Sequence, residues 1–536
     1  MARALALSVA VAAAVLALSG SGGAATQQSP KRGGTISVAE PFEPACLNRL
    51  LATCVDSSPN VESGVAKVLL PAFDVDARFQ YRPRLVTGVD VSTKRPFTLT
   101  YRIRPQARWN DGVPVTASDF VFTHEARVKL AALLPETERE QLEHVRRVTA
   151  VGAKTVRVTL REPFAGWQGL FPNVLPRHML EGQDLSQIWV DRVDDPKTGE
   201  PIGDGPFLVE GFERSNGLTL IRNPHYWGPH LARVDRLALR YDVDDVVQSL
   251  RQGDVDIALI VPKPLAAPFL TDPDFRVVTP ALSGYEHLAM RVGRGGHPAL
   301  RNPVVRRALA YGIDRTAIAR AVGGPEQPLQ SVVYLPQSPY QRSNWQRYER
   351  RPALARRLLA HAGCSRGLGG IYSCAGRRLS LRFVTGAAIP SRRVVLGIVQ
   401  AQLRNVGIEV IPTFVSDKVF THVVLPSGKF DVALFGYAFD PNPTATAAAY
   451  ACKGLDNFTG YCSRSVSAAY DQASRMLDPV SQARVLNGVD RTIAADAPVL
   501  PLYQANPPGV VRASVRGFVR LPYDPFANSE NWWLDR

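Results

Sequence analysis

The chain has 536 residues, of which 45% are hydrophobic and 21% are charged. This composition is globular and excludes a largely disordered chain, and the length exceeds what one core usually organises, so we expect two or three domains. The formal net charge is +15, but the arginines are dispersed and do not alternate with aromatic residues, so we expect no nucleic-acid partner.

Residues 1–25 have the pattern of a secretory signal peptide. Arg3 supplies the positive charge, residues 4–18 are almost entirely apolar, and the small residues 23–25 suit cleavage after them. The alternative is a membrane anchor, but the apolar run is shorter than a span needs. No cysteine precedes Cys46, so a lipid-modified N-terminal cysteine is not available. We therefore expect an exported protein that is soluble after cleavage, in the periplasm or at the outer face of the cell membrane.

The six cysteines fall into three local pairs. An even number of cysteines in an exported chain indicates disulfides. Proximity in the sequence favours these pairings: Cys46 with Cys54, Cys364 with Cys374, and Cys452 with Cys462. The alternative is zinc, but the chain has no CxxC motif and no histidine at ligand spacing from these residues, so we expect no metal.

Alternating apolar residues predict strands in the first half of the chain, at residues 33–40, 97–104 and 154–160. Residues 206–210 and 218–222 flank an Asn-Gly pair, which is typical of a hairpin. Alternation of this kind indicates sheets with one face in water.

After about residue 290, helical and strand patterns alternate. A helix is predicted to begin at Asn302-Pro303 and another to end at Gly363. Residues 379–385 form a predicted strand, followed by a helix capped by Ser391 and ending at Gly407. Further strands are predicted at 408–411 and 430–437, so the β-α-β order indicates a parallel sheet.

Ligands of open α/β sheets bind beyond the carboxyl ends of the strands. Asp440 lies just past the end of the strand predicted at 430–437 and is a ligand-contact candidate on that ground. Near the C-terminus, Trp532 and Trp533 are adjacent, so we expect the tail to pack back onto a domain, giving an interleaved architecture.

Catalytic motifs are absent from the sequence. There is no P-loop, HExxH or GxSxG motif, and His225 and His230 have structural surroundings. We therefore expect no catalytic residue and no cofactor.

Several segments resemble, in order, the oligopeptide- and dipeptide-binding proteins of ABC transporters, a family of extracellular solute-binding proteins (family 5). They are WNDG at 109–112, GDGPF at 203–207, RNPHYW at 222–227, GDVD at 253–256 and VVRRALAYGIDR at 304–315. At 203–207 the family's usual GTGPY has Asp204 in place of its Thr. The core is the expected place for Trp109.

The resemblance implies an α/β, two-lobe periplasmic-binding-protein fold (type II-like) with an extra third subdomain and an interleaved chain. Lobe I would comprise residues 33–72, 200–290 and 505–536, the extra subdomain residues 73–199, and lobe II residues 291–504. The ligand would be enclosed between the lobes when a hinge closes.

Peptide-binding members hold the ligand's α-ammonium with an Asp after a FDxxxxGW strand, and FDVALFGYAFDP at 430–441 resembles that pattern. Asp440 takes the position of the anchoring carboxylate. Tyr437 replaces the usual Trp and is expected, with Phe439, to flank the pocket. Two interpretations of Asp440 remain open: an ammonium anchor, or a local role in which it caps the turn before Pro441 or initiates the next helix.

The function implied is the substrate-binding component of an ABC importer. The expected partners are a small peptide and the membrane permease, and the protein is expected to act as a monomer. The alternatives are the same role for a metal chelate, glycoside or opine, a secreted α/β hydrolase, or an envelope protein for signalling or chaperoning with the same fold.

Overall fold

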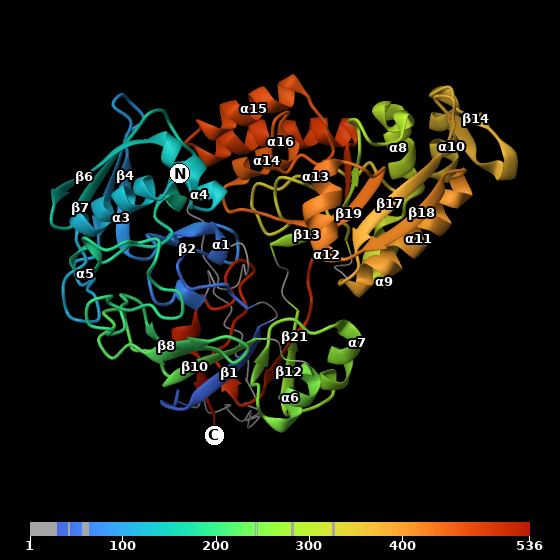
Figure 1. Cartoon of the computed structure of the whole chain (residues 1–536). Helices are drawn as coiled ribbons and strands as arrows, with labels where there is room; N and C mark the ends of the chain where they lie inside the picture. Colours follow the sequence, from blue (N-terminus) through green and yellow to red (C-terminus); the bar gives the residue numbers. More distant parts are fainter. Residues whose placement is uncertain are drawn as a thin grey trace, which may run out of the picture.

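The computed structural model describes residues 29–40, 43–55, 64–241, 243, 245–279, 283–323 and 327–535. The signal peptide predicted at residues 1–25 lies outside the described residues. Figure 1 shows two bodies, one blue to green that also takes in the red C-terminal end, and one yellow-green to orange-red. We call the first body lobe I and the second body, which is built from residues 284–504, lobe II.

Lobe I is built on a mixed seven-stranded sheet. In spatial order its strands are β12 (Phe275–Val278), β21 (Gly509–Arg512), β11 (Ile257–Ala258), β1 (Thr35–Glu40), β10 (Arg236–Tyr241), β9 (Gly217–Arg222) and β8 (Phe207–Glu213). Strand β1 is parallel to β10 and β11, and β8 with β9 forms the predicted antiparallel hairpin. In β1, the alternate residues Ile36 and Val38 are fully buried, as the period of a strand requires.

Lobe I also contains a four-stranded antiparallel sheet and a two-stranded hairpin. The sheet has the order β4 (Val86–Val91), β5 (Thr98–Ile103), β7 (Thr155–Leu160) and β6 (Val145–Gly152), and the hairpin pairs β2 (Phe73–Val75) with β3 (Tyr81–Pro83). The helices of lobe I are α1 (Ala52–Val55), α3 (Ala117–Lys129), α4 (Glu136–His144), α5 (Arg177–Leu180), α6 (Val246–Gln252) and α7 (Lys263–Ala266).

Lobe II is built on a five-stranded sheet in the order β18 (Glu409–Val415), β17 (Ser380–Gly386), β19 (Val432–Ala438), β13 (Gly284–Met290) and β20 (Val499–Gln504). Strand β17 is parallel to β18 and β19, as the β-α-β pattern predicts. Strand β13 is antiparallel to both β19 and β20, so the sheet is mixed rather than parallel throughout.

The helices of lobe II are α8 (Pro303–Gly312), α9 (Arg315–Ala321), α10 (Pro352–His361), α11 (Pro390–Val406), α12 (Asp417–Val419), α13 (Leu425–Ser427), α14 (Ala447–Tyr450), α15 (Arg464–Ser474) and α16 (Pro479–Asp496). Asn302 caps α8 as predicted, because its side chain accepts from the Val304 N–H at 2.9 Å. The cap predicted at Ser391 is wrong: α11 already begins at Pro390, whose fixed φ suits the first helical position.

Two further small strand groups are present among the described residues. Strands β14 (Ser365–Arg366), β15 (Tyr372–Cys374) and β16 (Arg377–Arg378) form a short sheet, and β22 (Val515–Arg516) pairs with β23 (Trp533–Leu534). Disulfides join Cys46 to Cys54, Cys364 to Cys374 and Cys452 to Cys462, the pairs that proximity in the sequence favours.

Each lobe has its own hydrophobic core. The core of lobe II draws on residues between 285 and 503, whereas that of lobe I combines residues between 36 and 259 with residues between 511 and 534. Trp532 is fully buried in the core of lobe I against Phe518 and Phe526, and Trp109 is fully buried in the same core. The chain therefore crosses between the lobes twice, from β12 to β13 and from β20 to β21.

Among the described residues, no helix combines the length and the apolar character that crossing a membrane requires.

Candidate ligand-binding pocket

Strand β19 directs the chain into the space between the lobes. Its first four residues are fully or almost fully buried, because β17 and β13 flank it in the interior of the sheet. Phe439 follows the strand, and its N–H donates to the carbonyl of Ser283 at 3.0 Å, beside the crossing from lobe I. The next residue, Asp440, is exposed. The predicted position of Asp440, just past the carboxyl end of the strand, is therefore correct.

A pocket of about 290 Å³ lies at this place. Lobe I contributes residues 78–82, 165, 167 and 168, and lobe II contributes residues 333–335, 338–340, 439–443, 476, 477, 479 and 482. Walls from both lobes mean that a molecule in the pocket touches both bodies at once.

Asp440 lies on the wall of this pocket and also takes part in a turn. Its Oδ1 accepts from the N–H of Asn442 at 2.6 Å, which is the local contact that the turn-capping interpretation requires. Across the pocket lies Tyr81 of lobe I, whose pKa is raised well above its usual value by burial and, after burial, by the charge of Asp440. Both interpretations of Asp440 are thus geometrically compatible with its position.

Phe439 and Tyr437 have different surroundings. Phe439 lines the pocket and packs against Tyr285, with ring centroids 4.7 Å apart. Tyr437 is not among the residues that line the pocket. Its ring stacks on His287 at 4.9 Å and its hydroxyl donates to the carbonyl of Asp456, so in this arrangement it packs within lobe II.

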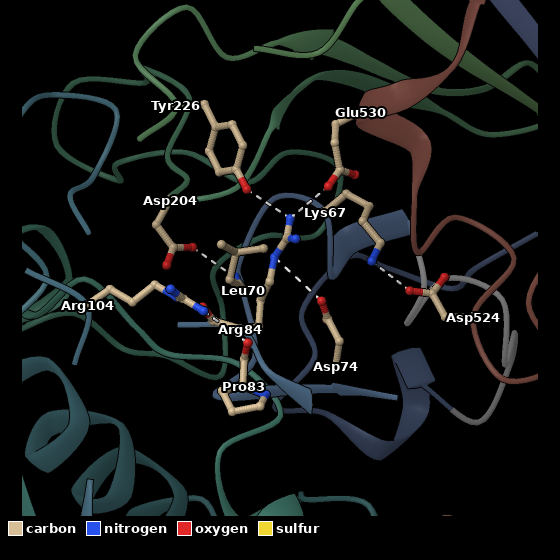
Figure 2. Close-up of polar contacts among 10 residues, drawn as sticks. All are labelled: Lys67, Leu70, Asp74, Pro83, Arg84, Arg104, Asp204, Tyr226, Asp524 and Glu530. Carbon is tan, nitrogen blue, oxygen red and sulfur yellow. Dashed lines mark hydrogen bonds and ion pairs between the residues drawn. The ribbon is translucent and has the colours of Figure 1, made fainter. Parts of the chain in front are cut away.

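Residues 78–82 of the lobe I wall belong to the β2–β3 hairpin, which a largely buried network of charged side chains holds in place (Figure 2). Arg84, just after the hairpin, lies 3.5 Å from Asp74, and it donates to the Tyr226 hydroxyl at 2.9 Å and to Glu530 at 3.3 Å. The hairpin is thereby tied both to the middle of the chain and to the C-terminal tail.

A second ion pair of this network joins Lys67 to Asp524, with Nζ and Oδ2 2.6 Å apart. Burial alone would lower the pKa of Lys67, but Asp524 and Asp74 reverse this effect and hold the pKa above its usual value. The neighbouring residue in the chain, Tyr523, places its ring edge-on to Phe79 with centroids 6.3 Å apart, so the tail supports the turn of the hairpin.

Asp204 lies beside this network, without an ionic partner in the contacts of Figure 2. It is fully buried, and its Oδ1 accepts from the Leu70 N–H at 2.8 Å. Burial raises its pKa to about 8. The Asp at this position of the GDGPF segment therefore keeps its proton to a higher pH than an exposed aspartate does.

The contributions of the hairpin and of residues 333–340 to the pocket were not apparent in the sequence. Tyr334 shows what this segment offers: it lines the pocket, it is 5% exposed, and among the described residues its hydroxyl has no hydrogen-bond partner. A buried hydroxyl without a partner is uncommon in folded proteins. No periodic or turn pattern marked this segment.

The lobes also meet directly beside the pocket. The Ala165 N–H donates to the carbonyl of Ser474 at 2.8 Å, and Glu162 pairs with Arg475 at 2.8 Å. A Cβ atom on Gly166 of lobe I would lie 2.7 Å from Nδ2 of Asn442 of lobe II, so a larger residue there would have to displace the Asn442 side chain. The structure is therefore a closed arrangement of the two lobes.

Within the part of the chain that the structure describes, no three His, Cys, Asp or Glu side chains converge in a way that could hold a metal ion.

Comparison with known proteins identifies the family to which this architecture belongs. Residues 80–458 match the family model of the bacterial extracellular solute-binding proteins, family 5. Protein XP55 of Streptomyces lividans is 29% identical over 468 residues, which cover 85% of this chain and 80% of that protein. The oligopeptide-binding protein OppA of Mycobacterium bovis is 27% identical over 449 residues, which cover 81% and 73% of the two chains.

Solved structures show the same fold. The periplasmic EDTA-binding protein EppA superposes with a TM-score of 0.83 at 20% identity, over 95% of this chain and 98% of that chain. The oligopeptide-binding protein AppA of Bacillus subtilis, in complex with a nonapeptide, has a TM-score of 0.75 at 20% identity, over 95% and 100% of the two chains. The fold is thus that of two-lobe periplasmic binding proteins, as expected. The chain belongs to the family 5 bacterial extracellular solute-binding proteins.

Proposed function

We propose that this solute-binding protein serves an ABC importer by capturing a small peptide with a free α-amino group and delivering it to a membrane permease. One observation carries the proposal: a pocket walled by both lobes has Asp440 among the residues that line it. A ligand that contacts both lobes stabilises the closed arrangement relative to an open one, as ligand-driven domain closure requires.

The ammonium group of a peptide is the chemical partner that suits Asp440. An ionised carboxylate has about four acceptor directions. The Asn442 N–H donates to Oδ1, and a carboxylate that accepts in a turn can also accept from an ammonium group. Because Asp440 is exposed, we expect the contribution of a charge-assisted hydrogen bond, about 1.5–3 kcal/mol, rather than that of a fully buried ion pair.

The names of two relatives support a peptide, since OppA and AppA are oligopeptide-binding proteins. The name of EppA, an EDTA-binding protein, keeps a metal chelate as the second candidate, beside a glycoside or an opine. Binding without turnover fits all these relatives, so we propose no enzymatic activity. We further propose that the protein is exported, acts as a monomer at or outside the membrane, and meets the permease in its closed, loaded form.

The experiment compares a free-amine dipeptide, Phe-Ala, with N-acetyl-Phe-Ala by isothermal titration calorimetry. Acetylation and the variant Asp440→Asn should each weaken binding about ten- to a hundredfold, and the variant should not discriminate further between the two peptides. Asp184→Asn is the matched control, because Asp184 is an exposed carboxylate outside the pocket and should leave both affinities unchanged.

Equal affinity of wild type and Asp440→Asn for Phe-Ala would rule out the anchor. Native mass spectrometry of freshly purified protein is the independent check, since co-purified peptides are expected. If the protein co-purifies with a metal chelate, or if heating the protein releases a non-peptide solute, the ligand is that solute and not a peptide. Loss of peptide uptake in cells without this protein tests delivery to a permease.

A further inference from the structure

Phe79 occupies a backbone position that few large side chains adopt. It lies in the turn of the β2–β3 hairpin with φ of +59°, in the left-handed region that favours glycine and asparagine. The turn is held tightly around it: the Phe79 N–H donates to the Asp76 carbonyl at 3.0 Å, and the Asp76 N–H to the Gln80 carbonyl at 2.9 Å. The Asp76 side chain accepts from two further N–H groups, those of Arg78 and Gln80.

The side chain of Phe79 reaches the other lobe. It packs against the hydrophobic core of lobe II, lines the pocket, and meets the Tyr523 ring of the C-terminal tail edge-on. Phe79 is thus a lobe I residue in contact with lobe II. A residue held in a sparsely populated conformation beside a ligand pocket points to a functional constraint, since folding of the hairpin alone does not call for an aromatic ring there.

The pocket around Phe79 is rich in aromatic rings. Both lobes contribute them: Phe79, Tyr81 and Trp167 from lobe I, and Tyr334, Tyr340 and Phe439 from lobe II. Rings at such a site stabilise an apolar, flat group through buried area and edge-to-face contacts. Asp440 follows Phe439 directly, so the carboxylate and the aromatic walls border the same space.

We propose that Phe79 is a specificity-determining residue, which selects peptides whose N-terminal side chain is aromatic by forming the lobe I wall of an aromatic subsite next to Asp440. The inference rests on the proposed function, because it assigns a side-chain preference to the same pocket. It adds the class of ligand: a short peptide that combines a free amine with an adjacent aromatic side chain.

The experiment measures the affinities of Phe-Ala, Leu-Ala and Ala-Ala for wild type, Phe79→Asn, Phe79→Leu and Phe79→Tyr. Wild type should bind Phe-Ala at least about tenfold more tightly than Ala-Ala. Phe79→Asn keeps a residue that tolerates the left-handed conformation and removes the ring. It should abolish most of that preference, Phe79→Leu should favour Leu-Ala over Phe-Ala, and Phe79→Tyr should retain the wild-type order.

Ser215→Asn is the control for the backbone, because Ser215 also has a positive φ, of +62°, but lies in the exposed β8–β9 turn. It should change neither affinity nor preference. Thermal unfolding of each variant verifies the fold, and if Phe79→Asn does not fold, Phe79→Leu still tests the inference, because an unchanged preference for Phe-Ala in that variant would overturn it.

The outcomes separate the two proposals. If wild type binds none of the dipeptides, nor longer peptides beginning with the same residues, the peptide function itself fails. If wild type binds peptides but shows no preference for Phe-Ala, the specificity inference is overturned while the function stands. If Phe79→Asn weakens Phe-Ala and Ala-Ala by the same factor, Phe79 is a structural contact between the lobes and the inference is also overturned.

Discussion

Replacing Asp204 by asparagine should change how the stability of this protein depends on pH. The amide side chain would keep the Oδ1 acceptor that holds the Leu70 N–H at 2.8 Å, and it would match the size of the protonated acid. It would carry one donor more than the protonated acid, which shifts the stability by an amount independent of pH, and it cannot ionise. The variant therefore isolates the titration of one fully buried carboxyl group.

The sign and size follow from the pKa values. Burial raises the pKa of Asp204 from 3.8 to about 8. Between these values the folded protein holds one proton more than the unfolded chain, so the contribution is fully present below about pH 4 and is lost as the pH rises through about 8. The slope is about 1.4 kcal/mol per pH unit for one proton, which amounts to roughly 2.7 kcal/mol between pH 5 and pH 7.

Urea unfolding of wild type and Asp204→Asn at pH 5, 6 and 7, at constant salt, measures this directly. The free energy of unfolding of the variant relative to wild type should grow by about 1.4 kcal/mol per pH unit, because all other groups titrate alike in both proteins. Asp184→Asn is the control, since hydrogen bonds to Ser186 lower the pKa of Asp184, out of this pH range. A difference between wild type and Asp204→Asn that stays constant from pH 5 to pH 7 would refute the reasoning.

Two further predictions concern ion pairs. Asp524→Asn leaves Lys67, whose side chain is 2% exposed, without its nearest carboxylate, and the free energy of unfolding should fall by about 3–5 kcal/mol in urea titrations; an unchanged midpoint would contradict a stabilising role of this pair. Arg475→Gln breaks the pair between the lobes with Glu162, in which the two side chains are 46% and 40% exposed. The free energy of binding of Phe-Ala should fall by less than about 1 kcal/mol, which is at most about fivefold weaker binding, and the free energy of unfolding should not change. A larger loss of affinity would show that this pair governs closure of the lobes.

Local patterns in the sequence predicted what depends on neighbours in the chain. The cap at Asn302 needs only the next two residues, and the end of α11 at Gly407 needs only a left-handed φ, here +85°. The position of Asp440 could be predicted from the apolar run of β19, because the first polar residues after a buried strand mark the place where the chain reaches the surface. At Ser391 two signals competed, and Pro390 one residue earlier already fitted the first helical position.

The rest of the pocket could not be predicted, because its walls come from segments that are far apart in the chain. Phe79 and Tyr334 line the same space, but no periodicity or spacing relates a turn of lobe I to a loop of lobe II. Tyr437 illustrates the same limit within a single strand. Its ring was expected to flank the ligand, yet His287 on the adjacent β13 offers a stacking partner that only the strand register reveals.

The double crossing of the chain has a consequence for how this molecule is made. Strand β21 lies between β11 and β12, and Trp532 fills the core formed by the first part of the chain. Lobe I thus cannot be completed until almost the last residue has emerged, whereas lobe II is continuous in sequence and has all its strands earlier. Contacts of such sequence separation form slowly. A nascent chain therefore cannot complete the fold of lobe I for most of its translation. A chain that stopped before residue 509 would lack β21, so β12 would be left unpaired and β11 paired on one side only, both open to proteases.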